Sequence, residues 1–417
     1  MMGLNTMKKL NSVITLLIIT SSIVISQTLR IVDKWGSPGS YPTITDAVNE
    51  SQPGDTIKVL SGTYTESVNV GKKLFIIAQD STVEVVSGTN AFTFYNGSSG
   101  SLLYGFTLKG HVYHPRNFEQ TEPIVIANNR FINTYVDFMN WTIIANNYFL
   151  KASLGNGINT YGSNASDKRI IVFNNTLDSC GIKLTGNHTS IIANKINNYS
   201  EYGILSYDAL NDFQIIANRI NNCGCGICLY GWQSKTNFTV SNNLITNCPI
   251  GLHYNYGPSL FTGVISNNIV YNSTVTAVLY HDGLWEGSSV YFYSNIFLNN
   301  TGNISFPASV WDYNCFYNSG SVPTPGIGNI NADPLFVNVV NGNFQLQSSS
   351  PCINTGHPNL IYSDIDRTRN DIGIYGGSHT MSNYENLLAP KVISLFMSPT
   401  QVIKGSDIII TGSGIAK

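Results

Sequence analysis

Three side chains that could transfer protons stand close together in the second half of the chain. His281 and Asp282 are adjacent, and Glu286 follows four residues later. Two carboxylates in one loop can approach within the distances that glycosidases use for an acid and a nucleophile or base. The imidazole of His281 could itself serve as a base. These three residues are therefore the candidate catalytic residues, and an ordinary solvated loop is the alternative interpretation.

A second candidate site, made of side chains with oxygen donors, lies near the C-terminal end of the sequence. Asp364, Asp366 and Asp371 have a spacing that could hold Ca²⁺. The run lacks the glycine and the terminal glutamate of an EF-hand loop. Ion pairs with Arg367 and Arg369 would explain the same carboxylates equally well. Calcium is therefore a possible cofactor, and the sequence makes no cofactor certain.

An asparagine that recurs along the sequence indicates which secondary-structure elements position these candidate site residues. It follows short apolar runs, rich in Ile, Val and Phe, that read as strands. A self-similar unit of this size indicates a solenoid. Asn tolerates the left-handed conformation of a sharp bend, and its side chain can hydrogen-bond to the Asn one coil above. We therefore predict one asparagine column along the stack. Its members are Asn129, Asn147, Asn175, Asn194, Asn218, Asn242, Asn267, Asn295 and Asn314.

This pattern, from about Leu29 to Gly377, resembles the right-handed parallel β-helix proteins, the architecture of pectate lyases and pectin methylesterases. The resemblance implies an all-β solenoid of roughly a dozen coils. Gly62 to Glu66 also resembles the start of pectin methylesterases. The paired Asp and downstream Arg-Pro-Trp of those enzymes do not occur, nor do the catalytic motifs of polygalacturonases and pectate lyases. The resemblance therefore supports the fold and not a particular activity.

The opening segment has the features of a cap on the first coil. Thr45 to Glu50 reads as a short helix, Pro53 to Asp55 as a turn, and Thr56 to Leu60 and Ser67 to Val70 as strands. A solenoid needs such a cap, because an open end would expose the core and unpaired strand edges. We therefore expect a short N-terminal capping helix on the β-helix.

A column of small residues sets the register of one strand face. Its members are Gly157, Gly181, Gly203, Gly226, Gly251 and Ala277. Aliphatic residues follow these small residues and must point inward, and alternation then sends the next residue of each coil outward. The inward residues are Ile158, Ile182, Ile204, Ile227, Leu252 and Val278.

The outer side of the same strands is rich in aromatic residues with interspersed carboxylates. Rings can stack on sugar rings, and carboxylates can accept their hydroxyl protons. In β-helix families this face usually forms the substrate groove. The alternative is that stacked aromatics only stabilise the sheet. The candidate substrate-binding residues are Tyr161, Tyr207, Asp208, Tyr230, Trp232, His253, Tyr256 and Trp285.

Two of the seven cysteines fall in matching positions of neighbouring coils. Cys223 and Cys248 each lie three residues before a glycine of the small-residue column. Neighbouring coils are about 4.8 Å apart, which allows a disulfide. A metal site in the run that also holds Cys225 and Cys228 is disfavoured, because alternation sends those two side chains to different places. The other three cysteines, at positions 180, 315 and 352, have no obvious partner.

The two ends of the sequence differ from its middle. Residues 1–26 read as a signal peptide, with two lysines before an apolar run, and a retained membrane anchor is the alternative. Residues 27–385 form the predicted β-helix domain, and their tail resembles that of bacterial extracellular β-helix proteins. Residues 389–417 resemble an incomplete start of an Ig-like domain of the plexin and transcription-factor type, so we expect the sequence to be truncated there.

Composition limits the choice of partner. The net charge is −2 and only 11% of residues are charged, so the chain lacks the excess of basic residues that is typical of nucleic-acid binding. We expect a monomer that is secreted or displayed on the cell surface, with no membrane span after signal removal. The predicted function is binding, and possibly cleavage, of extracellular polysaccharide by a lyase or hydrolase. The alternative is a non-catalytic surface, adhesion or structural module.

Overall fold

The computed structural model describes residues 28–385 except 116–119, 139, 153–154, 163–167, 208–209, 231–233, 256–259, 281–286, 303, 305–308, 321–322 and 324–325. It also describes two further strands, β37 (Lys391–Ser398) and β38 (Ile409–Ile415), which pair antiparallel. The predicted signal peptide lies outside the described residues.

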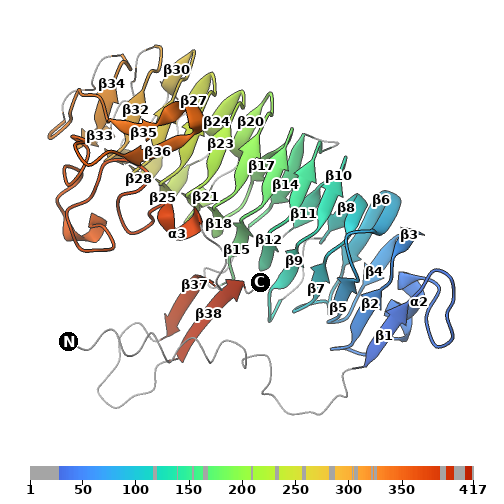
Figure 1. The fold of residues 1–417 in the computed structure, drawn as a ribbon. Coiled ribbons are helices and arrows are strands. Elements are labelled where there is room, and N and C mark those ends of the chain that lie inside the picture. Colours follow the sequence, from blue (N-terminus) through green and yellow to red (C-terminus); the bar gives the residue numbers. More distant parts are fainter. Residues whose placement is uncertain are drawn as a thin grey trace.

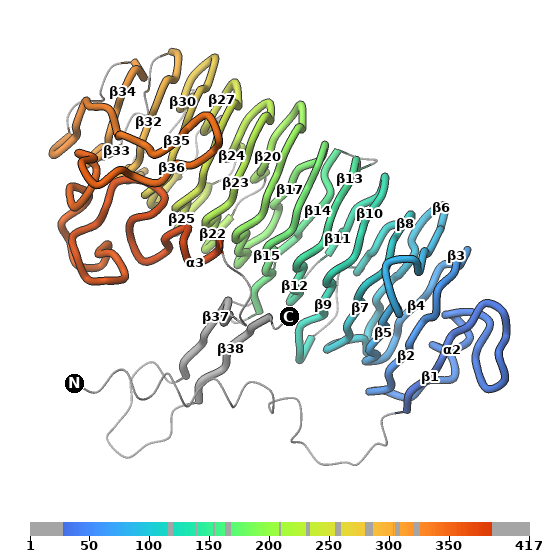
Figure 2. Tube along the Cα trace, in the orientation of Figure 1, coloured from blue at the N-terminus to red at the C-terminus, as the bar shows by residue number. Residues whose placement is uncertain are grey.

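The described chain winds into a right-handed parallel β-helix, so the predicted fold class is confirmed. Figures 1 and 2 show the coils stacked along one axis, from β1 at one end to β33 and β34 at the other. Each coil contributes strands to three rows, and each strand pairs in parallel with its equivalent in the next coil.

The first row is a continuous sheet. Its strands, in spatial order, are β1 (Leu29–Val32), β2 (Thr56–Val59), β5 (Phe75–Ala78), β7 (Leu102–Tyr104), β9 (Ile124–Ala127), β12 (Thr142–Ala145), β15 (Ile170–Phe173), β18 (Thr189–Ile192), β22 (Gln214–Ile216), β25 (Lys235–Ser241), β28 (Phe261–Ser266), β31 (Ser289–Tyr293) and β33 (Ser309–Asp312). The short strand β21 (Leu210–Asn211) pairs with β25 beside it.

The second and third rows share two long strands in the early coils, β6 (Val83–Phe94) and β8 (Thr107–Tyr113). The second row holds β3 (Gly62–Thr65), β10 (Arg130–Ile132), β13 (Tyr148–Leu150), β16 (Thr176–Asp178), β19 (Lys195–Asn197), β23 (Arg219–Asn221), β26 (Leu244–Thr246), β29 (Ile269–Tyr271), β32 (Ile296–Leu298) and β34 (Cys315–Tyr317). The third row holds β4 (Val68–Val70), β11 (Val136–Phe138), β14 (Asn156–Thr160), β17 (Gly181–Leu184), β20 (Tyr202–Ser206), β24 (Cys225–Tyr230), β27 (Ile250–Asn255) and β30 (Thr276–Tyr280).

The N-terminal end is capped as predicted. Helix α2 (Ile44–Glu50) begins after Thr43, whose side chain accepts a hydrogen bond from the amide of Asp46. Its apolar side, which includes Ile44 and Val48, belongs to the main core of the solenoid. The helix therefore covers the first coil.

The C-terminal segment folds back along the outside of the later coils (Figure 1). It contains the antiparallel pair β35 (Phe336–Asn338) and β36 (Asn343–Leu346), the 3₁₀ helices η1 (Val339–Asn341) and η2 (Leu360–Tyr362), and the short helix α3 (Ser382–Glu385). Apolar side chains of this segment form a second cluster with outward-facing residues of the coils, for example Ile374 with Ile269.

An asparagine ladder runs through the stack at the turn between the first and second rows. From Asn147 onward, each side-chain Oδ1 accepts a hydrogen bond from the backbone N–H of the Asn one coil earlier, at 2.9–3.0 Å. The Oδ1 of Asn129 accepts one from the amide of Phe106. The ladder satisfies backbone amides that the turn removes from the sheets. Its members are Asn129, Asn147, Asn175, Asn194, Asn218, Asn243, Asn268, Asn295, Asn314 and Asn329.

Two predicted ladder positions are wrong by one residue. Asn242 and Asn267 precede the ladder residues Asn243 and Asn268, and they hold the left-handed conformation with φ of 55° and 56°. In other coils this left-handed position holds Ala217 or another residue, so the bend does not require asparagine. The ladder asparagine is needed for its side-chain hydrogen bonds, and the preceding residue makes the bend.

Candidate functional site

The register of the strands in the third row agrees with the alignment of the chain's own repeats that the sequence predicts. Strand pairing places Ile158 opposite Ile182, Ile182 opposite Ile204, and the same series continues through the following coils. All six predicted inward residues are buried, as the alternation predicts. The remaining pairs in the series join Ile204 to Ile227, Ile227 to Leu252 and Leu252 to Val278.

Two tyrosines form a stack on the outer side of this row. Tyr207 follows β20 and Tyr230 ends β24, and their ring centroids are 5.6 Å apart with an angle of 13° between the planes. Tyr207 is 46% exposed, and Tyr230 is half-buried. The ammonium of Lys183, on β17, lies 4.9 Å from the centroid of the Tyr207 ring. Three successive coils therefore present a cation and two parallel rings on one surface.

Other members of the predicted face differ from this pair. Tyr161, directly after β14, is half-buried. His253, on β27, is only 8% exposed, so its ring is not available to stack on a sugar from the surface. It is paired in register with Cys228 of the preceding coil. The expected exposure of His253 is therefore wrong, because alternation along a strand does not predict how deeply a side chain is covered.

Most of the remaining predicted site residues lie outside the described residues. These are the three candidate catalytic residues His281, Asp282 and Glu286, and the candidate binding residues Asp208, Trp232, Tyr256 and Trp285. Their roles stay predictions.

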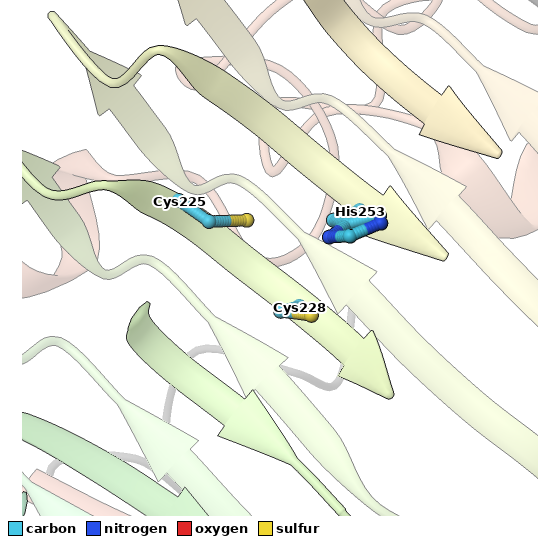
Figure 3. A group of neighbouring side chains, drawn as sticks. All are labelled: Cys225, Cys228 and His253. Atoms are coloured by element: carbon cyan, nitrogen blue, oxygen red, sulfur yellow. The ribbon is translucent and has the colours of Figure 1, made fainter. Parts of the chain in front are cut away.

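A buried group of metal-binding side chain types lies beneath this face. Cys225 and Cys228 on β24 and His253 on β27 place one donor atom each within 4.8 Å of one another (Figure 3). A hydrogen bond with Cys225, aided by His253 and by the charge of Lys235, lowers the pKa of Cys228 to about 6, although burial opposes the shift. Burial raises the pKa of Cys225. The expectation that alternation separates these two cysteines is wrong.

The cysteines of the predicted disulfide do lie side by side. Cys223 and Cys248 are buried free thiols in adjacent coils. A hydrogen bond between them lowers the pKa of Cys223 and raises that of Cys248. The bond itself stays a prediction. The repeat predicts no partner for Cys315 or Cys352, yet a hydrogen bond between these two thiols raises the pKa of Cys352.

The three candidate calcium ligands are engaged in the turns of the C-terminal segment. Asp364 accepts hydrogen bonds from the amides of Asp371 and Gly377. Asp366 accepts two from the amide and hydroxyl of Thr368, and Asp371 accepts one from the amide of Asn354. Burial, with a contribution from the charge of Asp371, raises the pKa of Asp364 to about 6. Among the described residues, no ion pair joins these carboxylates to the neighbouring arginines. The calcium hypothesis stays a prediction.

The fold also creates a depression that the sequence does not reveal. It measures about 360 Å³ and lies between the second row and the segment around η1. Lys195 and Arg219, which pair in register, line it together with Tyr271. Arg219 is also held by an ion pair with Glu385 of α3. Local patterns give no signal for this depression because its walls are far apart in the chain.

Comparison with known proteins supports the architecture. A family model for the right handed beta helix region matches residues 156–318. The pectate lyase Pel9A is similar at 14% identity, with coverage of 84% of this chain and 96% of that chain and a TM-score of 0.51. XylC, solved in complex with xylose, is similar at 11% identity, with coverage of 74% and 87% and a TM-score of 0.51. No curated protein matches significantly.

At such low identities these likenesses establish a shared fold and nothing more. The chain thus carries a right-handed parallel β-helix, the fold that it shares with these two solved structures. Within the described residues, no helix has the length and apolar character needed to cross a membrane.

Proposed function

We propose that this protein binds extracellular polysaccharide along the outer face of β17, β20 and β24. The observation that carries the proposal is the stack of the exposed Tyr207 on the half-buried Tyr230, which repeats an aromatic ring in successive coils. Coils rise by about 4.8 Å and a hexose is about 5 Å long, so a glycan chain that runs along the solenoid can meet one ring per coil.

The charge on this face favours acidic sugars. The Lys183 ammonium lies beside the exposed ring of Tyr207. A carboxylate on a sugar unit stacked at Tyr207 could pair with this ammonium, and a neutral sugar would lack that interaction. We therefore expect polymers that contain uronic acid to bind more tightly than neutral ones, although the overall charge of the chain is slightly negative.

A binding screen on a polysaccharide panel tests the proposal. The double substitution Tyr207→Ala and Tyr230→Ala removes two stacking contacts at roughly 1 kcal/mol each, so binding should weaken at least about tenfold. The Tm should change little, since both rings lie at the surface. Tyr104→Ala is the matched control, because Tyr104 is 39% exposed but lies on β7 of the first row. Unchanged affinity in the double variant would show that the two rings are structural.

Cleavage is a separate question within the same proposal. The supporting residues are His281, Asp282 and Glu286, which follow β30, the last strand of the same row, in the sequence. Release of reducing ends indicates a hydrolase, and release of unsaturated products indicates a lyase. If the protein binds a polymer but releases neither product, the alternative of a non-catalytic surface or adhesion module is supported. The Ig-like pattern of residues 389–417 favours that alternative, because adhesins chain such modules.

A further inference from the structure

A compact set of soft donor atoms lies beneath the outer face of the third row. Cys225 and Cys228 belong to β24, and His253 belongs to β27 in the next coil. One donor atom from each lies within 4.8 Å of the other two, and all three residues are buried. Figure 3 shows the two cysteines on one strand and the imidazole on its neighbour.

The strand pairing explains why three such residues meet. Cys228 and His253 are direct partners in adjacent coils. Cys225 lies on the same strand as Cys228, and its sulfur atom is close to the donor atoms of both partners. Between the two cysteines, a Cβ at Gly226 would lie 2.5 Å from a methyl carbon of Ile245 and 2.6 Å from a backbone oxygen of the next coil. Only glycine fits there, so the close packing of β24 against its neighbours is built into the fold.

We propose that Cys225, Cys228 and His253 bind one thiophilic metal ion, Zn²⁺ or Cu⁺. Two thiolates and an imidazole are ligands that both ions accept, whereas Mg²⁺ and Ca²⁺ prefer oxygen. The donors come from paired strands of a stacked sheet, so they are held in place before any ion binds. This preorganisation favours binding, because little conformational entropy is lost.

Ligand number distinguishes the two ions. Zn²⁺ with three protein ligands takes a fourth from water or a neighbouring group. Thiolate ligands suit Cu⁺ as well as Zn²⁺, so both ions are tested.

Metal titration of the full chain with reduced thiols tests the proposal. Co²⁺ replaces Zn²⁺ and reports thiolate ligands through a charge-transfer absorption band, and Cu⁺ is titrated against a chromogenic chelator. We expect one ion per chain. Cys225→Ser or His253→Asn should weaken binding by at least about a hundredfold, since each removes one of three ligands. Cys180→Ser is the matched control, because Cys180 is a buried cysteine outside the group.

A measurement on the unaltered chain guards against variants that fail to fold. X-ray absorption of the metal-loaded protein should show two sulfur neighbours at about 2.3 Å and one nitrogen at about 2.0 Å around Zn²⁺. The proposal is overturned if neither ion binds the reduced protein, or if Cys180→Ser weakens binding as much as Cys225→Ser. A disulfide between Cys225 and Cys228 in the secreted protein would also overturn it. These results are independent of glycan binding by the tyrosine pair.

Discussion

The asparagine ladder gives a sharp test, because two adjacent asparagines have different roles. Asn243 is a ladder residue, and its side chain takes part in four hydrogen bonds. It accepts two from Asn218, through the backbone N–H and the side-chain amide, both at 2.9 Å. It donates to the carbonyl of Ile215 at 2.8 Å and to Oδ1 of Asn268 at 2.9 Å. All of these bonds are buried.

Asn243→Ala should therefore be costly. The substitution removes four bonds and leaves the buried backbone N–H of Asn218 without its acceptor. A net hydrogen bond contributes about 1 kcal/mol, and an orphaned buried donor costs about 1–3 kcal/mol. Since the side-chain amide of Asn218 keeps its two carbonyl acceptors, we expect the free energy of unfolding to fall by about 3–5 kcal/mol.

Asn242→Ala is the matched control one residue earlier. The side chain of Asn242 donates to the carbonyls of Ile374 and Gly376 in the C-terminal segment. Loss of these two bonds should cost about 1–2 kcal/mol. The backbone should tolerate the change, since Ala193 and Ala217 hold the same left-handed position in earlier coils.

Urea unfolding of the three proteins, followed by far-UV circular dichroism, measures both effects. Because a solenoid can unfold in stages, the midpoints of equivalent transitions are compared. An equal or larger loss in Asn242→Ala would refute the assignment of Asn243 to the ladder.

Three further predictions follow from buried groups. Ile227→Asp buries an unpaired charge in the core, so the coils around β24 should become sensitive to limited proteolysis; unchanged resistance would contradict the assigned register. Peptide mapping of secreted protein should find Cys223 linked to Cys248, and two free thiols would exclude the bond. The pKa of Asp364 is raised in the folded state, so its protonated form favours folding, and this stability is lost as pH rises through about 6. Asp364→Asn should reduce the loss of stability between pH 4 and pH 7, and an identical pH profile in the variant would contradict the shift.

The fold could be predicted because the same physical constraint recurs in successive repeats of the sequence. An inward aliphatic residue follows each small residue, and the small residue is required by close packing between coils. At Gly203, for example, a Cβ would lie 2.6 Å from a methyl carbon of Ile220. A shift of the strand register by one residue would turn every one of these aliphatic side chains toward the solvent. The pattern therefore specifies the register strongly.

Contacts between distant parts of the chain could not be predicted in this way. The side chain of Asn267 donates to Asn370, which is 103 residues later in the sequence. Cys352 reaches Cys315 by the same return of the C-terminal segment. Neither pair belongs to the repeat, so the spacing along the sequence contains no information about them. For the same reason, the sequence does not predict that the C-terminal segment covers the outer surface of the coils. It does not predict the depression beside η1 either.

The two cysteines of β24 show where local rules fail and why. Alternation holds for a regular strand, and Cys225 and Cys228 differ by an odd number of positions, which should place them on opposite faces. The structure departs from that rule in β24, where Gly226, between the two cysteines, lies too close to Ile245 and to the next coil to carry any side chain. The two sulfur atoms and a ring nitrogen of His253 lie within 4.8 Å of one another. Strict alternation therefore misses a group of side chains that the paired strands β24 and β27 hold together.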